Sequence, residues 1–172
     1  SNDVSAAMMD GLGGRNLTGE SIREAVAFRR LVARLNVEFA EKGDWFVNVW
    51  QPDNVTDESG RRVPFWQADA EMLAPRPECW VLKPGEEWHG FGLREDGYCM
   101  LDPIKVSVTM PGVDIRSPDG GLLEWGIPAS VLTAYLDRFG IVAEKTTDFT
   151  ILFLFSIGVT RGKWGTLTDT LL

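Results

Sequence analysis

The chain has 172 residues, of which 44% are hydrophobic and 24% charged, and its formal net charge is −8 at neutral pH. These proportions are those of an ordinary globular domain, so they exclude the disordered and fibrous classes. An acidic surface disfavours binding to nucleic-acid phosphates and to anionic membranes, which leaves cationic ligands as the easier partners.

The first half of the chain is predicted to contain one long helix and two short strands. Ser21-Ile22-Arg23-Glu24 has the form of a capping box, and apolar residues then recur at helical spacing. Four segments are expected here: a helix from about residue 20 to Lys42 that ends at Gly43, a strand over 45–50 that stops at Pro52, a polar excursion over 53–75, and a strand over 78–82.

The second half is predicted to contain three strands and two helices. Between residues 104 and 110 apolar and polar residues alternate, which is typical of a half-buried strand. A helix is expected from Pro128 to Gly140, with Val131, Leu132, Tyr135, Leu136 and Phe139 on its apolar side. A short strand over 141–146 follows, then a central strand within 149–158 that is apolar on both faces, then a helix capped by Thr160.

These elements predict an α+β fold with a mainly antiparallel sheet covered by helices. A chain of this length forms one substantial core, so a single subdomain over residues 1–172 is expected, with Ser1-Asn2 resembling a tag remnant. The last helix stops on an apolar period without a terminating signal, which indicates a fragment of a larger protein. No segment has the length and apolar character of a membrane span, and two unpaired cysteines indicate a reducing, cytoplasmic compartment.

Two candidate sites are weak by sequence. Cys79 or Cys99 with His89, the single histidine, could form a nucleophilic pair, but a lone cysteine is usually a small buried hydrophobe and a lone histidine is usually bound to backbone. The glycines and Lys163 within 156–165 could hold an anion, but Trp164 follows the lysine where a phosphate loop needs Ser or Thr. Glycines that permit close helix–sheet packing are the alternative. One histidine cannot build a transition-metal site, so no metal is expected.

Glu144 is the carboxylate whose position most needs an explanation. It is predicted on a short strand beside the most apolar segment, where an acidic side chain is rare unless it is paired or functional. Its neighbour Lys145 cannot be its partner in a regular strand, because adjacent side chains point to opposite faces. A structural ion pair and a functional role both remain open from the residues alone.

Several segments together resemble the bacterial inducible ornithine/lysine/arginine decarboxylases. They occur in the family's order: MMDG, WFVNVWQPD, WHGF, MLDPIKV, WGIPASVLTAYLDRFGIVAEKT and ILFLFSIGVTRGKWGTL. The resemblance covers nearly the whole chain. It implies a pyridoxal-phosphate enzyme of the aspartate-aminotransferase fold, with this chain as the small subdomain that follows the cofactor-binding core.

The resemblance also implies that the cofactor-binding residues lie outside this chain. The family uses a lysine in a Ser-x-His-Lys context, an aspartate on the pyridine nitrogen and a histidine stacked on the ring. The five lysines here lack that context, and His89 belongs to another motif. The chain alone is therefore expected to bind no pyridoxal phosphate and to be inactive.

What the resemblance does place in this chain is a substrate contact. In lysine and ornithine members, Gly-Ile-Val-x-Glu-Lys carries a glutamate that accepts the substrate's distal cation, and this motif maps onto residues 140–145 with Glu144 as the acceptor. The tail VTRGKWGTL is closer to arginine-type members, some of which do not keep the glutamate. WHGF and DPIKV recur in the family, so His89, Asp102 and Lys105 are expected in a loop beside the active site.

The function expected from the resemblance is therefore the substrate-side part of a basic amino-acid decarboxylase. Lysine is slightly favoured over arginine, because Glu144 would touch the ligand and the tail would not, and both are favoured over ornithine. The reaction consumes a proton, which suits acid-stress or polyamine roles. The full-length protein is expected to be a homo-oligomer without nucleic-acid or membrane partners. The alternative is a stand-alone binding or interaction module derived from this family.

Overall fold

A computed structural model describes residues 2–40, 42–43, 46–92, 95, 97, 99–117 and 121–172. Its helices are α1 (Asn2–Met9), α2 (Gly11–Phe39), α3 (Ala70–Leu73), α4 (Ala129–Asp137) and α5 (Arg161–Leu171). Its strands are β1 (Asn48–Val49), β2 (Asn54–Thr56), β3 (Arg62–Pro64), β4 (Lys105–Thr109), β5 (Lys145–Thr146) and β6 (Thr150–Leu154). Three 3-10 turns complete it: η1 (Phe65–Gln67), η2 (Pro77–Cys79) and η3 (Glu87–His89). The α+β prediction is confirmed.

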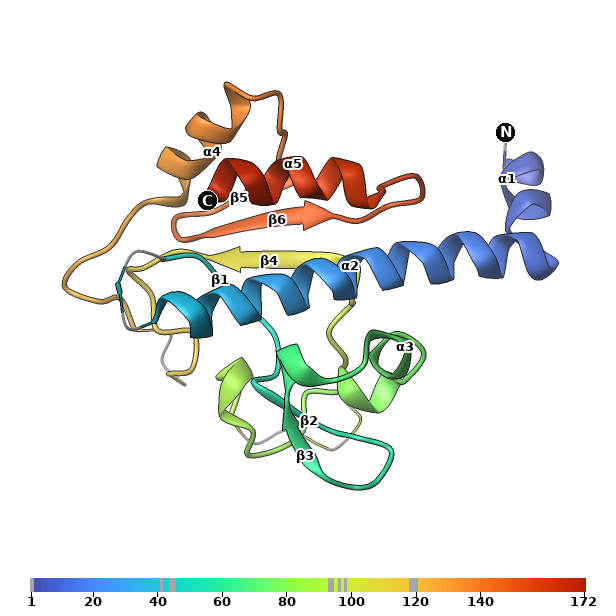
Figure 1. Ribbon diagram of the computed structural model, residues 1–172, viewed down its shortest axis with the longest axis horizontal. Coiled ribbons are helices and arrows are strands. Elements are labelled where there is room, and N and C mark those ends of the chain that lie inside the picture. The colour runs from blue at the N-terminus through green and yellow to red at the C-terminus, as the bar shows by residue number, and fades with distance from the viewer. Residues whose placement is uncertain are drawn as a thin grey trace.

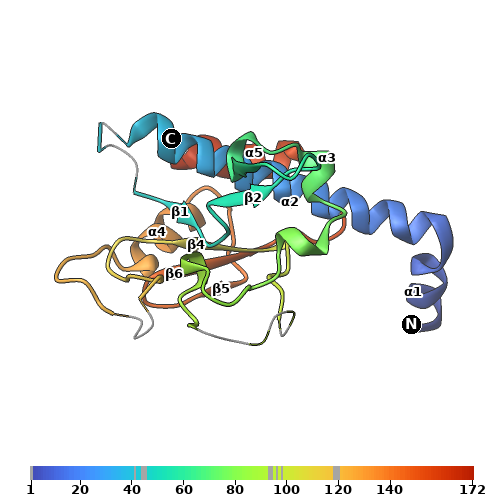
Figure 2. The same cartoon turned by 90° about the horizontal axis from the view of Figure 1, so that it is seen from below.

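A four-stranded antiparallel sheet with the order β1-β4-β6-β5 carries the main core. The long helices α2 and α5 lie on the same side of it, and α4 packs near its β5 end (Figures 1 and 2). Val106 pairs with Phe153 and Val108 with Ile151, so the buried side chains of β4 and β6 lie on one face of the sheet. That face is turned toward these helices. The interior position of β6 is confirmed, and so is the predicted alternation of β4 up to Val108; Thr109, predicted on the wet face, is buried.

A second lobe, residues 51–101, packs against the other side of α2 (Figure 1). It contains the β2–β3 hairpin and α3, and its own core is centred on Phe65, Leu73 and Trp80. The predicted polar excursion over 53–75 therefore folds around a core. The predicted strand over 78–82 is wrong: η2 begins at Pro77, and only an isolated bridge from Val81 to Met100 follows.

Helix α2 begins about ten residues before its predicted start. Its N-cap is Asp10, so the capping box at Ser21 is wrong. The Ser21 hydroxyl donates to the carbonyl of Leu17 one turn earlier, and the Glu24 carboxylate accepts a hydrogen bond from the Trp164 indole of α5. The Ser21–Glu24 pattern therefore lies inside a helix, where Ser21 bonds to the preceding turn and Glu24 contacts the helix α5. At the other end, the helix stops at Phe39, three residues before the predicted end.

The predicted elements of the second half differ from the structure mainly in length and burial. The start of α4 after Pro128 is confirmed, and Gly140 adopts φ +72°, the left-handed conformation that suits a glycine just past a helix. Of the five apolar residues predicted on the packed side of α4, only Leu132 and Leu136 are buried, and Ala129 is buried beside them. The strand over 141–146 contracts to β5, and β6 is buried on one face only, since Leu154 is 38% exposed.

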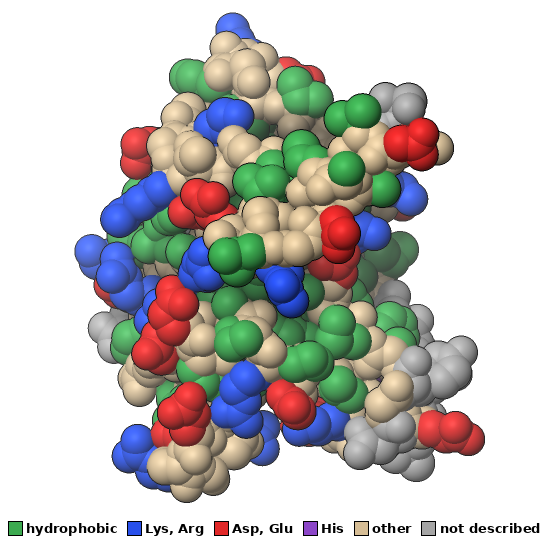
Figure 3. All heavy atoms as spheres, turned by 90° about the vertical axis from the view of Figure 1, so that its right-hand side faces the viewer, with side chains coloured by type: hydrophobic (Ala, Val, Ile, Leu, Met, Phe, Trp, Pro, Cys, Tyr) green, Lys and Arg blue, Asp and Glu red, His purple; other side chains and the backbone are tan. Residues whose placement is uncertain are grey.

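The last helix begins where the sequence predicts, whereas the first strand is shorter than expected. Thr160 is the N-cap of α5, as predicted, although its side chain makes no capping hydrogen bond. The strand expected over 45–50 is reduced to β1, and Trp45 lies outside the described residues. On the face in Figure 3, acidic and basic side chains are interspersed with hydrophobic ones. No described helix is long and apolar enough to cross a bilayer.

Candidate functional site

Glu144 lies at the edge of the sheet, just before β5, and is exposed to solvent. Its backbone N–H donates to the carbonyl of Leu152 in β6 at 2.9 Å, which fixes the position of the main chain. Lys145, directly opposite Leu152, is also exposed. Among the described residues no ion pair reaches the Glu144 carboxylate. The carboxylate therefore sits on a fixed backbone with its acceptor oxygens available.

His89 is held in the second lobe by backbone on both sides of its ring. Nε2 lies 2.9 Å from the carbonyl of Lys83, and Nδ1 accepts the N–H of Phe91 at 3.1 Å. This pattern requires a neutral ring with the proton on Nε2. The ring is 3% exposed and stacks on Phe91. The interpretation of His89 as a structural histidine is confirmed.

Gly90 explains why the WHGF turn contains a glycine. Its φ is +67°, and an ideal Cβ at this position would lie 2.2 Å from the carbonyl oxygen of Ile115. Any other residue would meet backbone there, so the turn and the neighbouring segment must both move to accept a side chain. WHGF is therefore a packing junction that holds His89 in place.

Asp102 and Lys105 belong to the segment by which the chain returns from the second lobe to the sheet. The Asp102 carboxylate accepts the N–H of Ile104 at 3.2 Å, which forms a local turn into β4. Lys105 begins β4 opposite Leu154, and its side chain is exposed. This segment is held in place by a residue that the sequence did not single out, Arg29.

Arg29 of α2 binds the chain where it leaves the sheet for the second lobe and where it returns. On the leaving side, Nη1 donates to the carbonyl of Trp50 at 3.0 Å. On the returning side, Nε donates to Pro103 at 2.9 Å and Nη2 to Lys105 at 2.9 Å, with Asp102 at 3.5 Å. One side chain thus fixes both crossing points between the two lobes.

The charge of Arg29 is stabilised by the dipoles of backbone carbonyls and by the face of the Trp80 ring. The side chain is fully buried, and its guanidinium lies 5.6 Å from the centre of the Trp80 ring. No described carboxylate lies within ion-pair distance of it. Burial lowers the pKa of Arg29 to about 9, an effect that the nearby Asp102 charge partly opposes. Arg29 is therefore still a cation at neutral pH.

The structure brings only some of the predicted residues together. Asp102 and Lys105 lie close together because Arg29 binds the backbone carbonyls of both. His89 lies within the second lobe, and Glu144 lies at the β5 edge of the sheet. Within the described part of the chain, no hydrogen bond or ion pair joins Glu144 to the other three. The sequence signal that could have identified Arg29 is an arginine on the apolar side of an amphipathic helix.

Neither cysteine forms an active nucleophile with His89. Both are free thiols, and burial raises the pKa of Cys79, which favours the unreactive protonated form. Both ring nitrogens of His89 are already occupied by backbone. No group of three or more metal-ligating side chains occurs among the described residues.

The segment 156–165 does not form a phosphate loop either. The Lys163 ammonium donates to the carbonyl of Gly158 at 2.9 Å, so it closes the turn before α5. The alternative prediction, glycines required for close packing, is also wrong. An ideal Cβ at Gly158 or Gly165 meets no atom within 4 Å, and Gly158 is instead needed for its φ of +89°.

The fold places the exposed Glu144 carboxylate at the edge of the sheet, and comparison with known proteins gives the family of the chain. Residues 1–163 match the family model described as Orn/Lys/Arg decarboxylase, major domain. The chain therefore belongs to the Orn/Lys/Arg decarboxylase family.

The relatives include enzymes named for two different substrates. The biodegradative arginine decarboxylase of Escherichia coli K12 is 52% identical over 172 residues, which cover 99% of this chain and 22% of that protein. The lysine decarboxylase LdcA of Pseudomonas aeruginosa is 42% identical, over 99% of this chain and 20% of its own length. The chain thus spans about a fifth of the length of these relatives.

Solved structures agree with this assignment. The constitutive lysine decarboxylase of E. coli superposes with a TM-score of 0.74 at 37% identity, over 98% of this chain and 20% of that one. Lysine decarboxylase A of P. aeruginosa gives a TM-score of 0.74 at 39% identity, again over 98% and 20%.

Three of the described side chains that could serve a pyridoxal phosphate are engaged elsewhere: His89, Lys42 and Lys163. His89 is stacked on Phe91 and bonded to backbone through both nitrogens, so it cannot stack freely on a cofactor ring. Lys163 is bonded to Gly158, and Lys42 lies over the Phe39 ring.

Proposed function

We propose that this chain is the substrate-side part of a pyridoxal-phosphate-dependent basic amino-acid decarboxylase, with the cofactor held by residues outside it. The observation that carries the proposal is the match to the family over almost the whole chain but only a fifth of the relatives' length. The reaction would release carbon dioxide from arginine, lysine or ornithine and consume a proton. The full-length protein would be a cytoplasmic homo-oligomer.

Within this function, Glu144 would accept the distal cation of the substrate. Its backbone is fixed by β6 and its carboxylate has no described ion-pair partner, as a receptor for an incoming cation requires. A carboxylate accepts an ammonium or, in bidentate form, a guanidinium. The 52% identity to an arginine decarboxylase, against 42% to a lysine decarboxylase, makes arginine the first substrate to test.

Carbon dioxide release by the full-length protein tests the activity. Arginine, lysine and ornithine are supplied in turn with pyridoxal phosphate, and we expect turnover of arginine or lysine. The matched sample is the 172-residue chain alone, which should release none because it lacks the lysine in a Ser-x-His-Lys context that carries the cofactor in the family. Turnover by the isolated chain, or none by the full-length protein with any of the three, would contradict the proposal.

The rival proposal is a stand-alone binding module, and the gene distinguishes it. A Ser-x-His-Lys sequence upstream in the same reading frame is expected for the enzyme. A start codon near residue 3 together with a stop codon after residue 172 would favour the module.

A further inference from the structure

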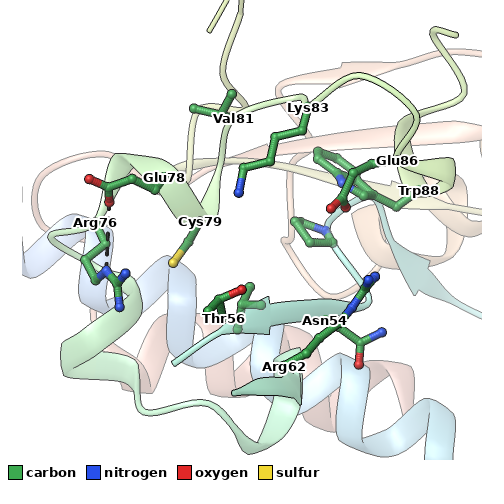
Figure 4. Close-up of a pocket in the computed structure, with 12 residues that line it drawn as sticks. Asn54, Thr56, Arg62, Arg76, Glu78, Cys79, Val81, Lys83, Glu86 and Trp88 are labelled. Carbon is green, nitrogen blue, oxygen red and sulfur yellow. Dashed lines mark ion pairs between the residues drawn. The ribbon is translucent and has the colours of Figure 1, made fainter. Parts of the chain in front are cut away.

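A pocket of about 320 Å³ opens in the second lobe between the β2–β3 hairpin and the segment 76–88 (Figure 4). Polar side chains supply much of its wall. The lining residues that matter for its charge are Arg62, Arg76, Lys83, Glu78 and Glu86. The pocket therefore carries three cations and two carboxylates within a chain whose net charge is −8.

Two of the three cations are not neutralised by an ion pair. Arg62 comes from β3 and Lys83 from the opposite wall, and in Figure 4 both point into the pocket. Neither forms an ion pair with a described residue. Arg76 is paired with Glu78 through a long contact of 3.8 Å. Two positively charged groups from different elements thus converge on one space.

Cys79 lines the pocket and gives a second indication that cationic side chains gather around it. Its thiol is buried, and burial raises its pKa; the positive charges of Arg76 and Lys83 act in the opposite direction, and the negative charge of Glu78 acts with burial. Two cations are therefore close enough to the sulfur to influence it. The thiol, which lies near Thr56 and across the pocket from Asn54, also provides a probe in the pocket wall (Figure 4).

We propose that this pocket binds the carboxylate group of a small molecule between Lys83 and Arg62. A guanidinium and an ammonium are the side chains that bind carboxylates by charge-assisted hydrogen bonds. Three cations and two carboxylates leave one net positive charge, which a monoanion balances. A phosphate dianion would exceed that charge and be repelled by Glu86 on the rim.

Protection of Cys79 from alkylation tests the proposal in the full-length protein. Because burial keeps the Cys79 thiol protonated, the small neutral reagent iodoacetamide is used at alkaline pH and with long incubation. It is added with sodium propionate, or with sodium chloride at equal ionic strength, and labelling is followed on peptides by mass spectrometry. Occupancy slows labelling by 1 + [L]/Kd, so propionate at ten times Kd should slow Cys79 about tenfold. Cys99, which does not line the pocket, serves as the internal reference and should keep its rate.

Variants assign the protection to the two cations. The double variant Lys83→Met/Arg62→Met should lose it, and both positions are exposed, so the fold should be retained. Arg138→Met, an exposed cation outside the pocket, should keep it. The proposal is overturned if chloride protects equally, if the double variant is still protected, or if Cys79 shows no protection. Stronger protection by inorganic phosphate than by propionate would overturn the carboxylate assignment.

Discussion

Replacing Arg29 with methionine is expected to lower the free energy of unfolding by about 3 kcal/mol or more. Four backbone carbonyls, at Trp50, Asp102, Pro103 and Lys105, would lose their donor in a buried site. Each buried acceptor left unsatisfied costs about 1–3 kcal/mol. Removal of a buried charge offsets part of this cost, which is why the expected total is well below the sum.

Hydrogen exchange locates the effect. In Arg29→Met, the amides of Trp50 and Lys105, which lie at the crossing points, should exchange faster, together with those of the second lobe. Arg34→Met is the matched control on the same helix. Arg34 is 53% exposed and paired only with Glu38, so its loss should cost no more than about 0.5 kcal/mol. Equal stability and equal exchange in the two variants would contradict the role given to Arg29.

Replacing Glu144 with glutamine in the full-length enzyme is expected to lower kcat/KM for its basic amino-acid substrate by about 10- to 100-fold. The amide keeps the shape of the side chain but removes its charge. A hydrogen bond to a charged group contributes about 1.5–3 kcal/mol, and 1.4 kcal/mol is a factor of ten. Because Glu144 is exposed, the variant should fold normally.

Comparing kcat/KM with thermal stability distinguishes a lost substrate contact from a destabilised fold. Lysine and arginine carry a distal cation, so both should be affected, whereas thermal stability should be unchanged. Glu124→Gln removes another exposed carboxylate and should leave the kinetics as they were. Unchanged kcat/KM in Glu144→Gln would remove the proposed contact with the substrate.

Local patterns predicted β4 and α5 well, because both are defined by the spacing of their own residues, whereas the strands expected over 45–50 and 141–146 are much shorter and the one over 78–82 is absent. Val106 and Val108 face the core, and Trp164 and Leu167 are buried, as their periodicity indicates. The β6 strand shows the limit of this reasoning. Its apolar residues indicated burial on both faces, but the number of layers that cover a sheet is a tertiary property.

The second lobe and Arg29 could not be predicted in the same way. Polar turns between 53 and 75 obscure a core that depends on Phe65 meeting Trp80 and on Val26 of α2. The carbonyls that bind Arg29 are up to 76 residues away along the chain, and carbonyls have no sequence signature. His89 was correctly interpreted because a lone imidazole has few chemical options, and its backbone partners follow from the turn around it.

The two crossing points held by Arg29 also bear on how this protein could change over time. Since the entry and exit of the second lobe are tied together at one side chain, the ends of residues 51–101 stay adjacent whatever lies between them. Closing a loop whose ends are already adjacent depends only weakly on its length. The length of the lobe can therefore change without moving the sheet, as long as its core contact with Val26 and the Trp80 ring over Arg29 are kept.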